Sequence, residues 1–283
     1  MITITNDLLK VSIKRHGAEL VSAIEVVSGK ERMWSGSDKY WGKVSPILFP
    51  IVGRVKDNYT FIDGQKYELT QHGFLRDQDF EVETLESDSV TFVYRSEGKH
   101  LESYPYEFEV RVGYVLKEGT LNVNWDVLNL SDNTMYYSIG GHPAFAISQE
   151  DNYSFELIGN KESSLITINE GHVDKEIPVM TPVHVDITYD ALKNDAIIYS
   201  NINTVILTNS DKSECIEVKC EGFDYVGLWA NTKHGHLPPF VCIEPWLGIT
   251  DDLTSNHQFT QKRGIRELES QSQESTGYSI KYL

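Results

Sequence analysis

The 283-residue chain carries 42 acidic and 25 basic side chains, for a formal net charge of −17 at pH 7. Nucleic-acid phosphates and anionic lipid surfaces bind clustered Lys and Arg, so this charge argues against both kinds of partner. Hydrophobic residues make up 40% of the chain and include 15 Tyr, 11 Phe and 5 Trp, enough for one large core. We expect a folded globular protein whose partner is a small molecule.

The N-terminal segment lacks the basic start and apolar core of a signal peptide, and no run of about 18 apolar residues occurs. The cysteines Cys215, Cys220 and Cys242 form no CxxC pair, and their odd number suits a reducing compartment. We therefore expect structural thiols and a cytoplasmic protein.

Alternation of apolar and polar residues predicts strands along most of the chain. In chain order these are Leu8–Ile13, Leu20–Val27, Asn58–Ile62, Gln65–Leu69, Phe80–Leu85, Ser89–Arg95, Phe108–Tyr114, Leu121–Val127, Met135–Ile139, Tyr153–Ile158, Val183–Thr188, Thr204–Thr208, Glu214–Lys219, Tyr225–Trp229, Phe240–Ile243 and Tyr278–Tyr282. Turn residues at 63–64, 87–88 and 117–119 predict three hairpins.

Helical periodicity is absent from every window of a dozen residues, so Thr188–Leu192 and Asn256–Gly264 can form at most short helical turns. The polar segment Glu267–Thr276 is predicted to be a surface loop before the last strand. Because no linker or repeat divides the chain, we predict one all-β antiparallel sandwich domain over residues 1–283.

Four segments break the alternation by placing polar residues beside aromatic ones, as binding sites in β-sandwiches do. They are Pro50–Arg54, Gln71–Asp77, Ser138–Phe145 and Phe240–Trp246. In the last of them Glu244 follows an apolar run and is predicted to end a strand. A partly desolvated carboxylate there would be a stronger base, whereas the alternative is a solvated glutamate at a strand end.

His142 follows two glycines and precedes Pro143, so we expect a sharp turn that presents the imidazole from a tight loop. Such a histidine can donate a proton near neutral pH, or it can merely hydrogen-bond the turn. His72 precedes a glycine in the same manner. Arg54 and Arg76 can make directed hydrogen bonds to sugar oxygens or phosphate, although an isolated arginine is more often a surface residue.

His234 and His236 alternate as two metal ligands on one strand would. The adjacent Leu237-Pro238-Pro239 indicates a loop instead, and no third ligand has a readable spacing. We therefore expect neither a metal nor an organic cofactor.

Taken in order, these motifs resemble the aldose 1-epimerase (galactose mutarotase-like) superfamily, and most closely its LacX-like branch. The resemblance covers almost the whole chain. It rests on the combination of Tyr40-Trp41-Gly42, Pro46 to Arg54, Ile62 to Tyr67, Gln71-His72-Gly73-Phe74, Gly140 to Phe145 and Ile243-Glu244-Pro245-Trp246.

The resemblance implies a two-sheet supersandwich with a sugar cleft on a concave face. It assigns Glu244 as general base and His142 as general acid, with Arg54 and His72 binding the substrate. The substrate-binding aspartate has no clear motif, and we choose Asp195 ahead of Asp190. The implied function is interconversion of the α and β anomers of a hexose or hexose phosphate.

Two departures bear on the substrate. Where the galactose enzymes have a second arginine, this chain continues Arg54-Val55-Lys56-Asp57-Asn58, so galactose specificity is not carried over. The motif His72-Gly73-Phe74-Leu75-Arg76 resembles that of the hexose-6-phosphate mutarotase branch, in which the arginine that matches Arg76 is associated with anion binding. We expect a free hexose, with a 6-phosphate as the alternative.

Two other classes of function remain open. A sugar-binding or regulatory module on the same fold would keep the cleft without turnover, because a fold does not guarantee a function. A glycoside hydrolase would need two carboxylates across the scissile bond, whereas the motifs supply only Glu244.

Overall fold

Strands dominate the structure, a computed structural model that describes residues 1–159 and 162–282. The strands are β1 Ile2–Thr5, β2 Leu9–Ile13, β3 Leu20–Glu25, β4 Ile47–Leu48, β5 Tyr59–Ile62, β6 Gln65–Glu68, β7 Glu81–Leu85, β8 Ser89–Arg95, β9 Phe108–Lys117, β10 Thr120–Asn129, β11 Met135–Tyr137, β12 Ile139–Gly141, β13 Ala144–Ala146, β14 Tyr153–Ile158, β15 Ser163–Asn169, β16 His172–Val179, β17 Val183–Asp186, β18 Ile197–Ser200, β19 Thr204–Asn209, β20 Cys215–Lys219, β21 Tyr225–Trp229, β22 Phe240–Leu247, β23 Arg266–Leu268 and β24 Gln273–Tyr282. The helical elements are the 3₁₀ turns Lys56–Asn58, Leu75–Asp77 and Phe259–Gln261 and one α-helical turn, α1 Tyr189–Leu192.

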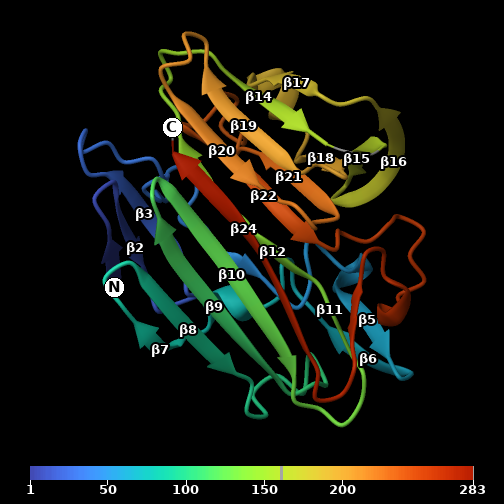
Figure 1. The fold of residues 1–283 in the computed structure, drawn as a ribbon. Coiled ribbons are helices and arrows are strands. Elements are labelled where there is room, and N and C mark those ends of the chain that lie inside the picture. Colours follow the sequence, from blue (N-terminus) through green and yellow to red (C-terminus); the bar gives the residue numbers. More distant parts are fainter. Residues whose placement is uncertain (160–161, 283) are drawn as a thin grey trace.

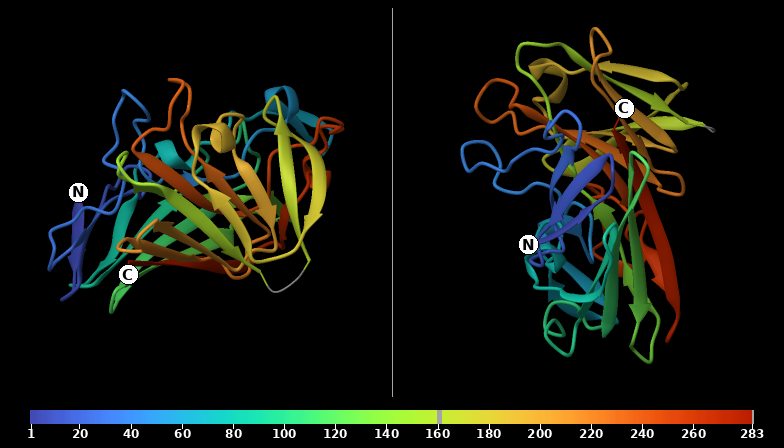
Figure 2. Two further views of the ribbon diagram at one scale, coloured as in Figure 1. Left: turned by 90° about the horizontal axis from the view of Figure 1, so that it is seen from above. Right: turned by 60° about the vertical axis from the view of Figure 1, so that its left-hand side comes forward.

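Two large antiparallel sheets form the sandwich. One has the strand order β17-β14-β19-β20-β24-β10-β9-β8-β7, and the other has the order β16-β15-β18-β21-β22-β12-β4, with β13 also paired to β22. Figure 1 shows β24 lying between β10 and β20, which joins the two halves of the first sheet. The small N-terminal sheet β1-β2-β3 and the hairpin β15-β16 lie at opposite sides of the molecule (Figure 2, left).

The core between the sheets decides which side chains remain for the site. Along β22, Val241, Ile243 and Leu247 belong to the main buried cluster, which also holds Trp125 of the other sheet. Alternate residues point to opposite faces of a strand. The set Phe240, Cys242, Glu244 and Trp246 therefore faces away from the other sheet.

The predicted hairpins at 63–64, 87–88 and 117–119 are confirmed by the pairs β5-β6, β7-β8 and β9-β10. The prediction of a loop over Glu267–Thr276 was wrong at both ends. Its first residues belong to β23, paired with β11, and its last residues begin β24, paired with β10. Strand pairing overrode the polar composition because backbone groups there find ladder partners.

Among the described residues, no helix is long and apolar enough to cross a membrane.

Candidate functional site

A cavity of about 480 Å³ opens on the outer face of the β22 sheet, within the size range of small-molecule sites. All six residues singled out in the sequence line it: Arg54, His72, Arg76, His142, Asp195 and Glu244. Asp190 does not line it. Instead the Asp190 carboxylate accepts a hydrogen bond from Lys193 Nζ at 2.8 Å and is exposed.

His142 and Glu244 meet because two short strands share one register. Ile139 of β12 pairs with Leu247, and Ala144 of β13 pairs with Cys242, so the chain from β12 to β13 runs straight along β22. That register places His142 directly opposite Glu244. The two side chains are 3.1 Å apart, measured from Nε2 of the imidazole to Oε2 of the carboxylate.

The sharp turn expected at His142 is therefore wrong. Gly140 and Gly141 lie in β12, and neither has a positive φ. Glycine is needed at both positions because no room is left for a side chain. A Cβ on Gly140 would lie 2.6 Å from the Trp246 indole, and one on Gly141 would lie 3.0 Å from the Tyr278 hydroxyl. The predicted end of the strand at Ile243 is also wrong, because β22 continues to Leu247.

Pro245 is tolerated in this strand by its position. Ile243 donates its N–H to the Pro143 carbonyl at 3.3 Å on the β12-β13 side. Two residues on, Pro245 lies opposite Gly141, the last residue of β12, just beyond the paired residues Gly140 and Trp246. Its nitrogen faces the end of β12, so the missing N–H falls where the β12 pairing stops.

The pair is almost fully buried, with Glu244 1% and His142 7% exposed. Burial raises the pKa of Glu244 well above its ordinary value, and the negative charge of Asp195 adds to that increase. Burial lowers the pKa of His142 to about 3, and the positive charge of Arg76 acts in the same direction. The 3.1 Å contact lacks the geometry of a hydrogen bond, so among the described residues Glu244 Oε2, like His142 Nδ1, is a buried polar atom without a hydrogen-bond partner.

His72 is held by the backbone of the loop before Arg54. The Gly53 N–H donates to His72 Nδ1 at 3.2 Å, which leaves the proton of the neutral ring on Nε2. Burial lowers the pKa of His72 well below its ordinary value, with contributions from His142, Arg76 and Arg54. His72 is thus a neutral ring whose Nε2 lies 3.2 Å from Gln71 Nε2, and its ring centroid lies 5.9 Å from that of His142.

The two arginines have different surroundings. Arg54 is exposed, and its Nη2 donates to Gln71 Oε1 at 2.9 Å. Arg76 is partly buried and donates from Nη2 to the Gln71 carbonyl at 2.9 Å, so it braces the backbone just before His72. Among the described residues, its Nε is a buried donor without a hydrogen-bond partner, 3.8 Å from the Asp77 carboxylate.

Sequence reasoning missed the aromatic wall of the cavity. The Trp41 ring lies tilted against His142 with their centroids 4.7 Å apart, and the Trp229 ring meets the same imidazole edge-on at 5.3 Å. Tryptophan faces are typical platforms for apolar sugar faces. Trp41 lay inside a quoted motif, but its direction depends on packing against Phe240 from a distant strand, 5.8 Å away. Lys193 and Lys233 were also missed at this cavity.

The histidines His234 and His236 lie exposed in a loop, as expected. Within the described residues, the group able to offer three metal ligands is His142, Cys242 and Glu244, whose ligand atoms lie within 4.8 Å of one another. Burial raises the pKa of the Cys242 thiol well above its ordinary value, so this ligand is protonated. The same His142 and Glu244 form the close pair described above.

The chain is similar to several known proteins. A family model described as aldose 1-epimerase matches residues 1–261. The plasmid-encoded Protein LacX of Lactococcus lactis subsp. lactis is 28% identical over 94% of each chain. A galactose mutarotase related enzyme from Lactobacillus acidophilus is similar with TM-score 0.95 and 32% identity, over 100% of this chain and 97% of that one. A galactose mutarotase-like protein from Lactobacillus casei gives TM-score 0.93 and 27% identity over 100% of both chains.

Proposed function

The chain belongs to the aldose 1-epimerase family, and we propose that it interconverts the α and β anomers of a hexose or hexose phosphate without a cofactor. The observation that carries this proposal is the buried pair His142 and Glu244, 3.1 Å apart in a cavity of about 480 Å³. A carboxylate and an imidazole at one sugar ring are sufficient for acid–base opening of a hemiacetal.

In the proposed reaction Glu244 removes the proton from the anomeric hydroxyl while His142 donates a proton to the ring oxygen. The C1–O5 bond breaks, its electron pair goes to the protonated oxygen, and C1 becomes an aldehyde carbon. Rotation about C1–C2 presents the other face of the aldehyde. The ring then closes with both protons returned, so His142 and Glu244 end as they began.

The positions of the other residues fit the binding of this substrate. His72 offers the proton on Nε2 and Arg54 offers its guanidinium to sugar oxygens, which also stabilises charge on the developing carbonyl oxygen. Asp195 is assigned to accept hydrogen bonds from sugar hydroxyls.

The proton count of the pair explains how both partners are ready at neutral pH. With the pKa of Glu244 raised and that of His142 lowered to about 3, burial favours the state of the empty site in which the pair holds one proton, on Glu244. The productive state has the same proton on His142 instead. Substrate hydroxyls that donate to the carboxylate favour that state, so binding moves the proton without uptake from solvent.

The decisive experiment is NMR exchange spectroscopy or polarimetry on a panel of pure α-anomers, with and without a 6-phosphate. Faster equilibration of at least one sugar than in buffer supports the proposal. Sugar binding without any acceleration would contradict it and favour the binding-module alternative.

Arg76→Ala is expected to lower kcat/KM about tenfold for a free hexose and its 6-phosphate alike, because Arg76 braces Gln71 beside His72. Hydrogen bonds to charged groups contribute about 1.5–3 kcal/mol, which sets this magnitude. The measurement is anomer exchange with both substrates. A loss confined to the phosphate, in an enzyme at least tenfold more efficient on it, would instead identify Arg76 as a phosphate ligand and contradict the expected free hexose.

Exhaustive chelation is expected to leave the exchange rate unchanged, because the proposed proton transfers need no Lewis acid. The check is the rate after dialysis against EDTA, with metal content measured in the same sample. Activity lost on dialysis and restored by zinc or manganese would contradict the metal-free mechanism and point to the ligand set His142, Cys242 and Glu244.

A further inference from the structure

Behind Arg54 lies a buried ion pair that takes no part in the chemistry above. Lys262 Nζ is 2.8 Å from Asp251 Oδ1, and the two side chains are only 2% and 5% exposed. Removing two charges from water is costly, and apolar residues of similar volume often give equal or greater stability. The backbone groups that this pair contacts indicate a role other than stability.

The pair holds the backbone that carries Arg54. The Arg54 carbonyl accepts the Asp251 N–H at 2.9 Å and Lys262 Nζ at 3.4 Å. The other Asp251 oxygen accepts the Lys56 N–H at 2.9 Å and the Ser255 hydroxyl at 3.0 Å. Residues 54–56 are thereby joined to residues 249–251 around one ammonium group, which also donates to the Ile249 carbonyl at 2.6 Å.

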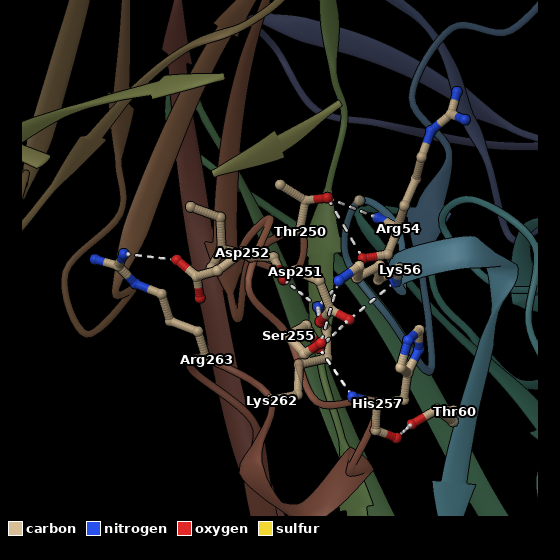
Figure 3. Close-up of polar contacts among 12 residues, drawn as sticks. Arg54, Lys56, Thr60, Thr250, Asp251, Asp252, Ser255, His257, Lys262 and Arg263 are labelled. Carbon is tan, nitrogen blue, oxygen red and sulfur yellow. Dashed lines mark hydrogen bonds and ion pairs between the residues drawn. The ribbon is translucent and has the colours of Figure 1, made fainter. Parts of the chain in front are cut away.

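Thr250 completes the connection on the cavity side. Its hydroxyl accepts the Arg54 N–H at 3.1 Å and donates to the Gly171 carbonyl at 2.7 Å. The contact is too close for any side chain at residue 53, because a Cβ on Gly53 would lie 2.4 Å from Thr250 Cβ. Figure 3 shows the Arg54 side chain extending away from this cluster while its backbone remains within it.

We propose that the buried Asp251–Lys262 ion pair is a positioning device for Arg54, setting where its guanidinium lies in the cavity. This rests on the proposed function, in which Arg54 binds sugar oxygens. A charged donor and acceptor have directional requirements that an apolar pair lacks, so the pair selects one register between the two segments. Misplacing a substrate contact by about 1 Å can cost up to about 10²-fold.

A double-mutant cycle tests the proposal. Lys262→Met is expected to raise KM about tenfold with a smaller change in kcat, because Arg54 is displaced while Glu244 and His142 are not. In an Arg54→Ala background the same substitution should change KM less than twofold, since the contact it positions is already gone. Equal effects of Lys262→Met in both backgrounds would show a merely structural role and overturn the proposal.

Arg263→Met is the matched control, because it neutralises the neighbouring residue of the same segment. Its side chain points the other way in Figure 3 and pairs with Glu176 and Asp252. We expect its KM to stay within twofold of wild type, and a tenfold rise would overturn the proposal. If Lys262→Met does not fold, Asp251→Asn replaces it in the cycle, and a melting curve checks that this variant is folded. A smaller effect on KM in the Arg54→Ala background then supports the proposal, and equal effects in both backgrounds overturn it.

The measurements distinguish failure of the proposed function from failure of the positioning proposal. If wild type accelerates no anomer exchange, that proposal fails, and the same cycle is measured as the Kd of a sugar in NMR titrations. Coupling between Lys262 and Arg54 in Kd then supports positioning, and additivity overturns it.

Discussion

Glu244→Gln is expected to lower the rate of catalysed anomer exchange by about 10²–10⁴-fold, the range for loss of an acid–base group. The amide has the shape of the carboxyl but cannot accept the hydroxyl proton. Because burial raises the pKa of Glu244 and so favours its neutral form, a neutral amide should leave the melting temperature and sugar affinity nearly unchanged. Exchange NMR, thermal melting and a sugar titration measure the three quantities.

The control for this substitution is Glu156→Gln, on the exposed face of β14 in the other sheet. It makes the same chemical change far from the cavity and should keep the wild-type rate. Wild-type exchange in Glu244→Gln would refute the assignment of the base.

His142→Asn is expected to lower the exchange rate about 10²-fold or more, because it removes the group assigned to protonate the ring oxygen. The pH profile of wild type gives a second reading. With the pKa of His142 lowered to about 3, the pair takes up a second proton only near that pH. With the pKa of Glu244 raised, the single proton is lost only well above 4.5. The rate should therefore be flat through neutral pH and fall on both sides.

Anomer exchange from pH 4 to 9 tests the flat part of this profile. An acid limb with a midpoint near the ordinary histidine value of about 6.5 would mean that His142 titrates freely, contrary to its burial. Retention of the full rate in His142→Asn would remove the residue from the mechanism.

Much of the fold follows from local sequence. The hairpins β5-β6, β7-β8 and β9-β10 were predictable because alternation and turn residues act over a few neighbouring positions. β18 escaped prediction, although it pairs with β15 and β21 in the β22 sheet. Its partners lie far away in the chain, so no local pattern reports the pairing. The hairpin β15-β16 also escaped prediction, although its two strands are neighbours in the chain.

The residue types of the site were determined by the sequence alone, whereas their geometry was decided by the tertiary structure. Glu244 and His142 could be identified as a carboxylate and an imidazole in aromatic surroundings, but their 3.1 Å approach depends on the shared register of β12, β13 and β22. The choice of Asp195 over Asp190 at the cavity likewise depends on where α1 ends. Proton transfer and desolvation act over a few ångströms between residues about a hundred positions apart, and only the folded chain brings those distances about.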